Sequence, residues 1–134
     1  MTNYGDHTDF RILKFTVKIE GRDDEITVPI YGAEEILMAI PEGTKYQSTI
    51  HFLALKSLKN FVYTQAAVKA GITVKKTVTE LGDFEPREEP YSIEFKEDQT
   101  PSGFFFRGKC PVKSTYTLDG EVVLENSWTV EVTK

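Results

Sequence analysis

Apolar and polar residues alternate along several short stretches of the chain. Phe15, Val17 and Ile19 alternate with Thr16 and Lys18, which is the period of a β-strand that buries one face. The same alternation occurs in residues 26–30, 46–54, 72–74 and 128–133. Because each of these strands can bury only one face, we expect two sheets that close on each other.

Turn-forming residues divide these strands at short intervals. Glycine, proline or asparagine occurs near residues 21, 32, 41–43, 60, 71, 82–90, 101–103, 108–111 and 120. Asp119 and Gly120 both tolerate positive φ and lie between two apolar runs, which predicts a two-residue hairpin turn. The spacing predicts seven to nine short strands in an all-β sandwich.

The stretch from Phe52 to Ala70 allows a second interpretation. Four of its apolar residues fall at near-helical spacing: Leu55, Leu58, Val62 and Ala66. A helix over this stretch would find a C-cap in Gly71. The neighbouring strands and the β-favouring run 61–64 favour two strands instead, and we expect them to join at Lys59 and Asn60.

Composition supports a single soluble β-domain. The chain has 134 residues, of which 51 are Thr, Val, Ile, Phe, Tyr or Trp, and only 14 are Leu or Ala. We expect a flexible segment over residues 1–9 and one domain over 10–134. The single Cys110 excludes an internal disulfide, and no apolar run is long enough for a membrane span. We therefore expect a cytoplasmic protein.

Charge and candidate chemistry point to binding more than to catalysis. With 16 Lys and Arg against 21 Asp and Glu, the net charge of −5 argues against nucleic acid and favours a basic partner. His7 and His51 are far apart in sequence, and no nucleophile elbow, phosphate-binding loop or paired metal ligand occurs. Cys110 is expected to be a buried strand cysteine. We expect no enzyme, no metal and no cofactor.

Phe104, Phe105 and Phe106 are consecutive, so in a strand at least one ring must point away from the side that the others bury. That ring is either covered by a loop or lines a cavity or contact surface. The residues by themselves thus indicate a β-sandwich, and they leave open whether one of these rings lines a binding site.

Four motifs follow one another between Pro41 and Lys134. They are Glu42-Gly43-x-x-Tyr46 with Ile50-His-Phe52; Tyr63-Thr-Gln65 with Lys69-Ala-Gly71-Ile-x-Val74-x-Lys76 and Leu81-Gly82-x-Phe84-x-Pro86; Glu97-Asp-x-x-Pro101-Ser-Gly103-Phe-x-x-Arg107-Gly108; and Lys113-Ser114-x-Tyr116 with Trp128-x-Val130-x-Val132. In this order and spacing they resemble the C-terminal immunoglobulin-like domain of the Rho GDP-dissociation inhibitors. The strand pair over residues 15–30 extends the resemblance to most of the chain.

The resemblance implies an immunoglobulin-like sandwich of two antiparallel sheets that carries prenylated small GTPases. Members of the family hold the geranylgeranyl tail of a Rho-type GTPase between the sheets and so keep the GTPase soluble in the cytosol. A monomer that contacts membranes only transiently, during extraction of its client, is expected on this basis.

The same resemblance implies site residues. Positions that match the family's prenyl slot are Val17, Tyr46, Leu58, Phe105, Val112 and Trp128, although Phe105 stands where an aliphatic residue is usual. Glu97 and Asp98 match acidic positions that face the basic segment before the prenylated cysteine. Asp119 keeps only part of a longer acidic run, so its contact with the GTPase is the least supported.

One departure from the family concerns nucleotide clamping, which in the family needs a helical N-terminal arm. Only about nine residues precede Phe10, too few for a helix pair, so we expect lipid binding without clamping. Two other hypotheses remain at this point. One is a prenyl- or acyl-binding factor for other lipidated proteins, and the other is a filled interaction sandwich or an enzyme that uses Cys110.

Overall fold

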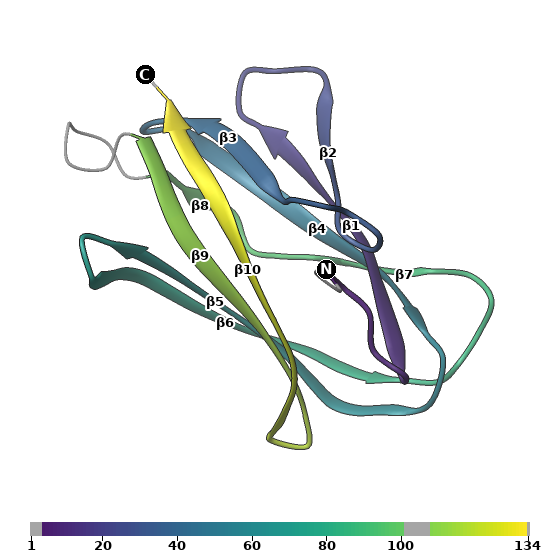
Figure 1. Ribbon diagram of the computed structural model, residues 1–134. Helices are drawn as coiled ribbons and strands as arrows, with labels where there is room; N and C mark the ends of the chain where they lie inside the picture. The colour runs from purple at the N-terminus through teal and green to yellow at the C-terminus, as the bar shows by residue number, and fades with distance from the viewer. Residues whose placement is uncertain (1–3, 101–107, 134) are drawn as a thin grey trace.

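The computed structural model describes residues 4–100 and 108–133, which form ten strands (Figure 1). The strands are β1 (Phe10–Ile19), β2 (Glu25–Pro29), β3 (Leu37–Pro41), β4 (Lys45–Ala54), β5 (Leu58–Lys69), β6 (Ile72–Phe84), β7 (Tyr91–Glu94), β8 (Asp98–Gln99), β9 (Gly108–Leu118) and β10 (Glu121–Thr133). No helix, and so no helix able to cross a membrane, occurs within these described ranges.

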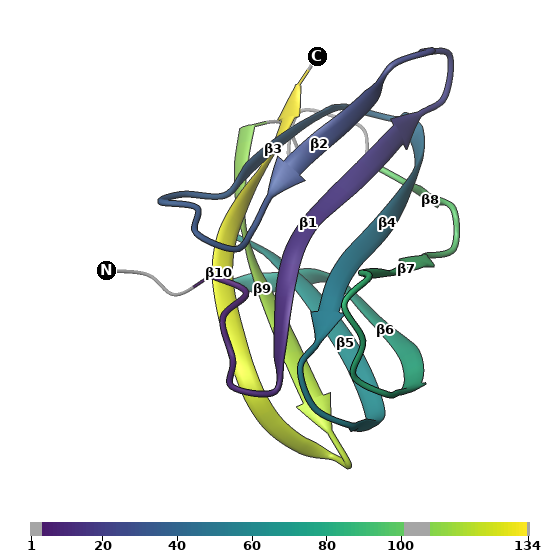
Figure 2. The same ribbon diagram turned by 90° about the vertical axis from the view of Figure 1, so that its right-hand side faces the viewer.

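The strands form two five-stranded sheets that face each other (Figures 1 and 2). One sheet has the order β2-β1-β4-β7, with β8 also paired to β4, and the other has the order β3-β10-β9-β5-β6. The predicted all-β sandwich is confirmed. It differs from the expectation in two details, because the short β8 raises the number of strands to ten, and β3 runs parallel to β10.

The stretch 52–70 forms two strands and not a helix, but their junction lies earlier than expected. β4 ends at Ala54 and β5 begins at Leu58, so Lys59 and Asn60 lie inside β5. Asn60 adopts a positive φ of 48° at an irregularity in the β5–β6 ladder. The backbone N–H of Asn60 donates to Asp83 Oδ1 at 2.8 Å, so a contact distant in sequence stabilises this bulge.

Two hairpin turns follow the expected turn chemistry. Asp119 and Gly120 join β9 to β10 with φ of 50° and 79°, which confirms the predicted two-residue turn. Ala70 and Gly71 join β5 to β6 with φ of 53° and 78°. Gly71 therefore belongs to a hairpin turn, and the alternative of a helix C-cap is wrong.

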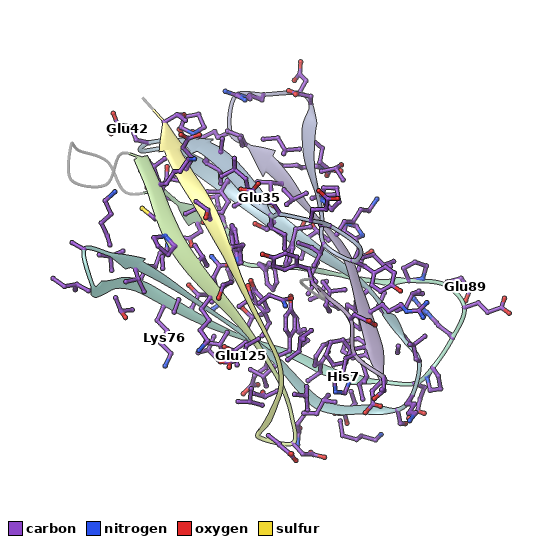
Figure 3. All side chains as sticks on the ribbon, viewed as in Figure 1. His7, Glu35, Glu42, Lys76, Glu89 and Glu125 are labelled. Carbon is purple, nitrogen blue, oxygen red and sulfur yellow. The ribbon has the colours of Figure 1, made fainter. Side chains whose placement is uncertain are left out.

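Aromatic rings fill one end of the space between the sheets. Phe52 contacts Phe61 and Phe84 with ring centroids 5.4 and 5.0 Å apart, and Phe10 lies 4.9 Å from Phe61. Phe10, Phe52 and Phe61 are fully buried in the hydrophobic core, and the partly buried Phe84 packs against it. The ring of His7, which is labelled in Figure 3, stacks on Phe10 at 4.8 Å. We call this group the aromatic end.

Residues 4–9 contact the second sheet before β1 begins. The Tyr4 hydroxyl donates to the carbonyl of Ser127 at 2.9 Å, and the N–H of Gly5 donates to Asn126 Oδ1 at 3.1 Å. Tyr4 belongs to the hydrophobic core. The N-terminal segment is thus attached to β10.

Candidate functional site

A hollow lies between the two sheets beside the aromatic end. It holds about 490 Å³ of empty space, counting the part of its mouth that is open to solvent. We call it the inner cavity. Its lining comes from both sheets: Phe15, Val17, Val28, Ile30, Ile36, Met38, Ser48, Tyr63, Gln65, Phe95, Ser114, Tyr116, Asn126 and Trp128.

Most of this lining is apolar because the inward positions of β1, β2 and β3 carry aliphatic side chains. Val17 is fully buried, while Val28 and Met38 are 6% and 8% exposed. On the opposite wall the aromatic rings of Tyr63 and Tyr116 lie 5.2 Å apart and border the aromatic end. Burial raises the pKa of the Tyr63 hydroxyl, so this group stays protonated. The lining residues of the cavity thus present apolar groups and neutral polar groups, with no charged side chain among them.

One hydrogen-bonded chain of polar groups crosses the second sheet's wall of the cavity. The Trp128 indole Nε1–H donates to Ser114 Oγ at 2.8 Å, and Ser114 Oγ lies 2.7 Å from the Tyr63 hydroxyl. The Tyr63 hydroxyl in turn donates to Gln65 Oε1 at 2.9 Å. Ser114 is only 2% exposed, so these bonds satisfy a buried hydroxyl.

The inner cavity continues into a larger and more polar groove. The groove holds about 1,140 Å³, including open solvent, and shares Ser48, Tyr63, Gln65 and Phe95 with the inner cavity. We call it the outer groove. Its remaining lining residues are Tyr46, Lys75, Thr77, Val78, Thr79, Glu80, Lys96, Glu97 and Asp98.

Phe95 lies where the two hollows meet. Its ring stacks on Tyr63 at 5.4 Å and on Phe15 at 6.1 Å. Its backbone is fixed to β4, since its N–H donates to the carbonyl of Ser48 at 2.9 Å and its carbonyl accepts from Gln47 Nε2 at 3.0 Å. The ring thus bridges the two sheets at the mouth of the inner cavity.

Lys75 and Asp98 form an ion pair along the outer groove. Lys75 is on β6 in one sheet and Asp98 is on β8 in the other, so the pair links the sheets. Asp98 also accepts from the Tyr46 hydroxyl at 3.4 Å. Burial, and after it the charge of Asp98, raises the pKa of Tyr46, which therefore remains a neutral donor.

The residues that were expected to line a prenyl slot lie in different parts of the structure. Val17 and Trp128 line the inner cavity, and Tyr46 lines the outer groove. Leu58 is fully buried at the aromatic end, where it pairs with Phe84. Val112 is 3% exposed on the inner face of β9, outside the lining of both hollows. Phe105 lies outside the described residues.

The expected acidic contacts are not gathered in one place. Glu97 and Asp98 line the outer groove, where Asp98 is already paired with Lys75. Asp119 lies in the β9–β10 turn, at the end of the sandwich away from β8 (Figure 1). There the Asp119 side chain accepts from Asn60 Nδ2 at 2.9 Å. Asp119 therefore belongs to the turn and lies apart from the two carboxylates of the groove.

Of the residues that line the inner cavity, only Val17 and Trp128 were expected from the sequence, and those not expected include Gln65, Phe95 and Ser114. Alternation predicts that Gln65 shares the inward face of β5 with Phe61 and Tyr63, and this signal was available. The polar nature of Gln65 and Ser114 argues against an inward position, so only the facing strands reveal their role. Phe95 follows β7 in an irregular stretch without a strand pattern.

The two other residues that were considered for chemistry, Cys110 and His51, line neither the inner cavity nor the outer groove. Cys110 is buried on β9, as expected. On the outer face of the first sheet, His51 bonds through Nε2 to Thr16 Oγ1 at 2.9 Å and through Nδ1 to Ser92 Oγ at 2.8 Å, and it lines neither hollow. Across residues 4–100 and 108–133, no three His, Cys, Asp or Glu side chains are grouped to hold a metal ion.

Comparison with known proteins gives a consistent result. A family model described as RHO protein GDP dissociation inhibitor matches residues 2–134. The Rho GDP-dissociation inhibitor of Schizosaccharomyces pombe is 29% identical over 99% of this chain and 70% of its own length. The Rho GDP-dissociation inhibitor 1 of Arabidopsis thaliana is 29% identical over the whole chain and 58% of its own length. The human Rho GDP-dissociation inhibitor 1 is 27% identical over 71% of the chain and 48% of its own length, so the chain spans only part of these relatives.

Proposed function

Because this chain belongs to the Rho GDP-dissociation inhibitor family, we propose that it binds the geranylgeranylated C-terminus of a Rho-type GTPase in the inner cavity. Binding there keeps the lipidated GTPase in solution and lets it cycle between membranes and cytosol. The observation that carries this proposal is an apolar hollow between the sheets that opens into a polar groove.

The size of the hydrophobic term supports a carrier. A geranylgeranyl chain has about 20 carbons, and transfer of each buried CH₂ contributes about 0.8 kcal/mol. The gross gain is on the order of 10 kcal/mol, which can compete with a bilayer for the same chain. Lining by Val17, Val28 and Met38 supplies apolar contact without a buried charge.

The polar groove suits the peptide that precedes the lipid. Glu80, Glu97 and Asp98 bring carboxylates to the groove, with Lys75 and Lys96 among them. The whole chain carries a net charge of −5. These features favour a basic segment and would mainly speed and orient its association, with an effect that weakens in salt.

Extraction from liposomes tests the proposal. A geranylgeranylated Rho-type GTPase in its GDP form is bound to vesicles, and the fraction released by the protein is measured after sedimentation. Val28→Trp places an indole in the cavity and is expected to weaken the complex by about tenfold or more through overpacking.

Val122→Trp is the matched control, because Val122 is 54% exposed on β10 and should tolerate the same change. Melting temperatures establish that both variants are folded. Release by the wild-type protein that does not exceed release by buffer, or equal release by Val28→Trp, would contradict the proposal.

A further inference from the structure

The hydrogen bonds of the polar chain in the cavity wall all run in one direction, from donor to acceptor. The Trp128 indole fixes this direction. An indole N–H can only donate, so Ser114 Oγ accepts from Trp128 and keeps its own O–H to donate. The Tyr63 oxygen is the acceptor 2.7 Å away, and the Tyr63 O–H then donates to Gln65 Oε1. Every hydroxyl along the chain is satisfied in this arrangement.

The reverse order leaves a buried group unpaired. If the Tyr63 hydroxyl donated to Ser114, the Ser114 O–H would need another acceptor, and none is recorded among the described residues. Ser114 is 2% exposed, so an unpaired hydroxyl there would cost about 1–3 kcal/mol. The carboxamide of Gln65 is therefore held with Oε1 toward Tyr63.

It follows that the Gln65 amide nitrogen is a donor without an assigned acceptor. Its two N–H groups point away from Tyr63, and no bond from Nε2 is recorded within the described part of the chain. Gln65 lines both the inner cavity and the outer groove, so its side chain belongs to the boundary between them. A chain of four residues on three strands thus orients one N–H donor pair at the cavity mouth.

We propose that Gln65 Nε2 binds the carbonyl group next to the lipid in the ligand, and so selects lipids whose head carries such an acceptor. This inference rests on the proposed function, since it assumes that the hydrocarbon lies in the inner cavity. The carboxyl ester or amide carbonyl of a prenylated cysteine is an acceptor of this class. A chain of equal length that lacks a carbonyl fills the cavity but leaves the Gln65 donors without a ligand partner.

Two probes that share one hydrocarbon test the proposal. The first is S-geranylgeranyl-N-acetylcysteine methyl ester, and the second is geranylgeranyl ethyl thioether, which keeps the chain and the sulfur but has no carbonyl. Affinities are measured for the full chain by Trp128 fluorescence, since this indole lines the cavity. We expect the wild-type protein to prefer the first probe by about five- to tenfold, the effect of one net hydrogen bond.

Gln65→Glu and Gln65→Leu should abolish that preference. Glutamate keeps the size of Gln65 and can accept from Tyr63, but an ionised carboxylate has no N–H to donate. Either change alters the cavity lining, so both variants are expected to bind the thioether more weakly than the wild-type protein does. The ratio between the two probes separates the hydrogen bond from general packing.

Thr64→Val is the control, since Thr64 precedes Gln65 on β5 and the alternation places it on the outer face. This variant should keep the wild-type preference. Retention of the preference in Gln65→Glu, or an equal loss for both probes, would overturn the role of Gln65 while leaving the carrier function in place. If the wild-type protein binds neither probe, the proposed function fails, and the role of Gln65 fails with it.

Discussion

Gly5 holds the N-terminal segment against both sheets. Its carbonyl accepts from the N–H of Ile12 at 2.8 Å, while its own N–H donates to Asn126, a residue of the inner cavity wall. Its φ is +68°, and a Cβ built there would lie 2.4 Å from the carbonyl oxygen of Ile12. Only glycine fits at this position.

Gly5→Ala should therefore lower the free energy of unfolding by about 2 kcal/mol or more, since left-handed strain and a backbone clash act together. Gly21→Ala is the matched control, because Gly21 has a similar φ of +85° but no atom within 4 Å of the added carbon. Its cost should be only about 1 kcal/mol. Urea titrations measure both, and equal losses would show that the clash at Gly5 is relieved in solution.

His51 makes stability depend on pH. Burial, followed by the charge of Lys14, lowers its pKa below the usual 6.5, with Glu25 acting in the opposite direction. A lowered pKa in the folded state means that folding favours the neutral ring. The contribution is complete above about pH 6.5 and is lost as the pH falls through the lower folded pKa.

Unfolding titrations at pH 7.5 and 5.5 should thus show a larger loss of stability for the wild-type protein than for His51→Gln. The difference between the two proteins removes the contribution of the carboxylates, which titrate in both. A loss that is equal in the two proteins would mean that His51 has the same pKa in the folded and unfolded states.

At the scale of elements, the Lys75–Asp98 pair fastens β6 to β8 across the outer groove. The two side chains are 37% and 34% exposed, so solvent screens part of the attraction. Neighbouring Lys76 is exposed and points away from the sandwich (Figure 3). The pair holds the two edges of the groove together through opposite charges.

A double-mutant cycle with Lys75→Met and Asp98→Asn should give a coupling free energy of about 0.5–1 kcal/mol in low salt, and less at 1 M salt. Lys76→Met combined with Asp98→Asn should give no coupling beyond about 0.3 kcal/mol. Chemical denaturation supplies all the values. Equal coupling for the two lysines would show that only the general charge matters, and not the link between sheets.

At the scale of the whole molecule, the sandwich is filled at one end and hollow beside it. Phe10, Phe52 and Phe61 occupy the aromatic end, whereas aliphatic residues such as Val17 and Val28 line the inner cavity. Aromatic residues line the cavity too, but they share its walls with aliphatic and small polar side chains. The aromatic end thus differs in its packing from the part of the core in which we propose that the ligand binds.

Much of the fold could be predicted from the sequence because each strand carries its own signal. The alternation of Phe15, Val17 and Ile19 and the turn at Asp119 and Gly120 are local features, and the structure confirms them. The junction expected at Lys59 and Asn60 was wrong, because the Asn60 bulge is held by the side chain of Asp83 from another strand. Local pattern carries no information about such a contact.

Less of the candidate site than of the fold could be predicted from the sequence. The resemblance to a family pointed to Val17 and Trp128, which line the inner cavity, and to Leu58, which the structure places at the aromatic end. Alternation tells which side chains point inward, but it does not tell where the interior is left empty. The roles of Gln65 and Ser114 depend on the register of three strands, so they become visible only in three dimensions.

The central claim is that the inner cavity takes up the isoprenoid, and Met38 offers a direct test. The chain has two methionines, and Met38 lines the cavity, so protein labelled with ¹³C-methyl methionine gives one signal from the site. On addition of a geranylgeranylated, methylated C-terminal peptide, we expect the Met38 methyl signal to shift and to show nuclear Overhauser contacts with the prenyl chain. Addition of the unprenylated peptide should leave the signal unchanged. Binding of the prenylated peptide without any change at Met38, or no binding at all, would contradict the account.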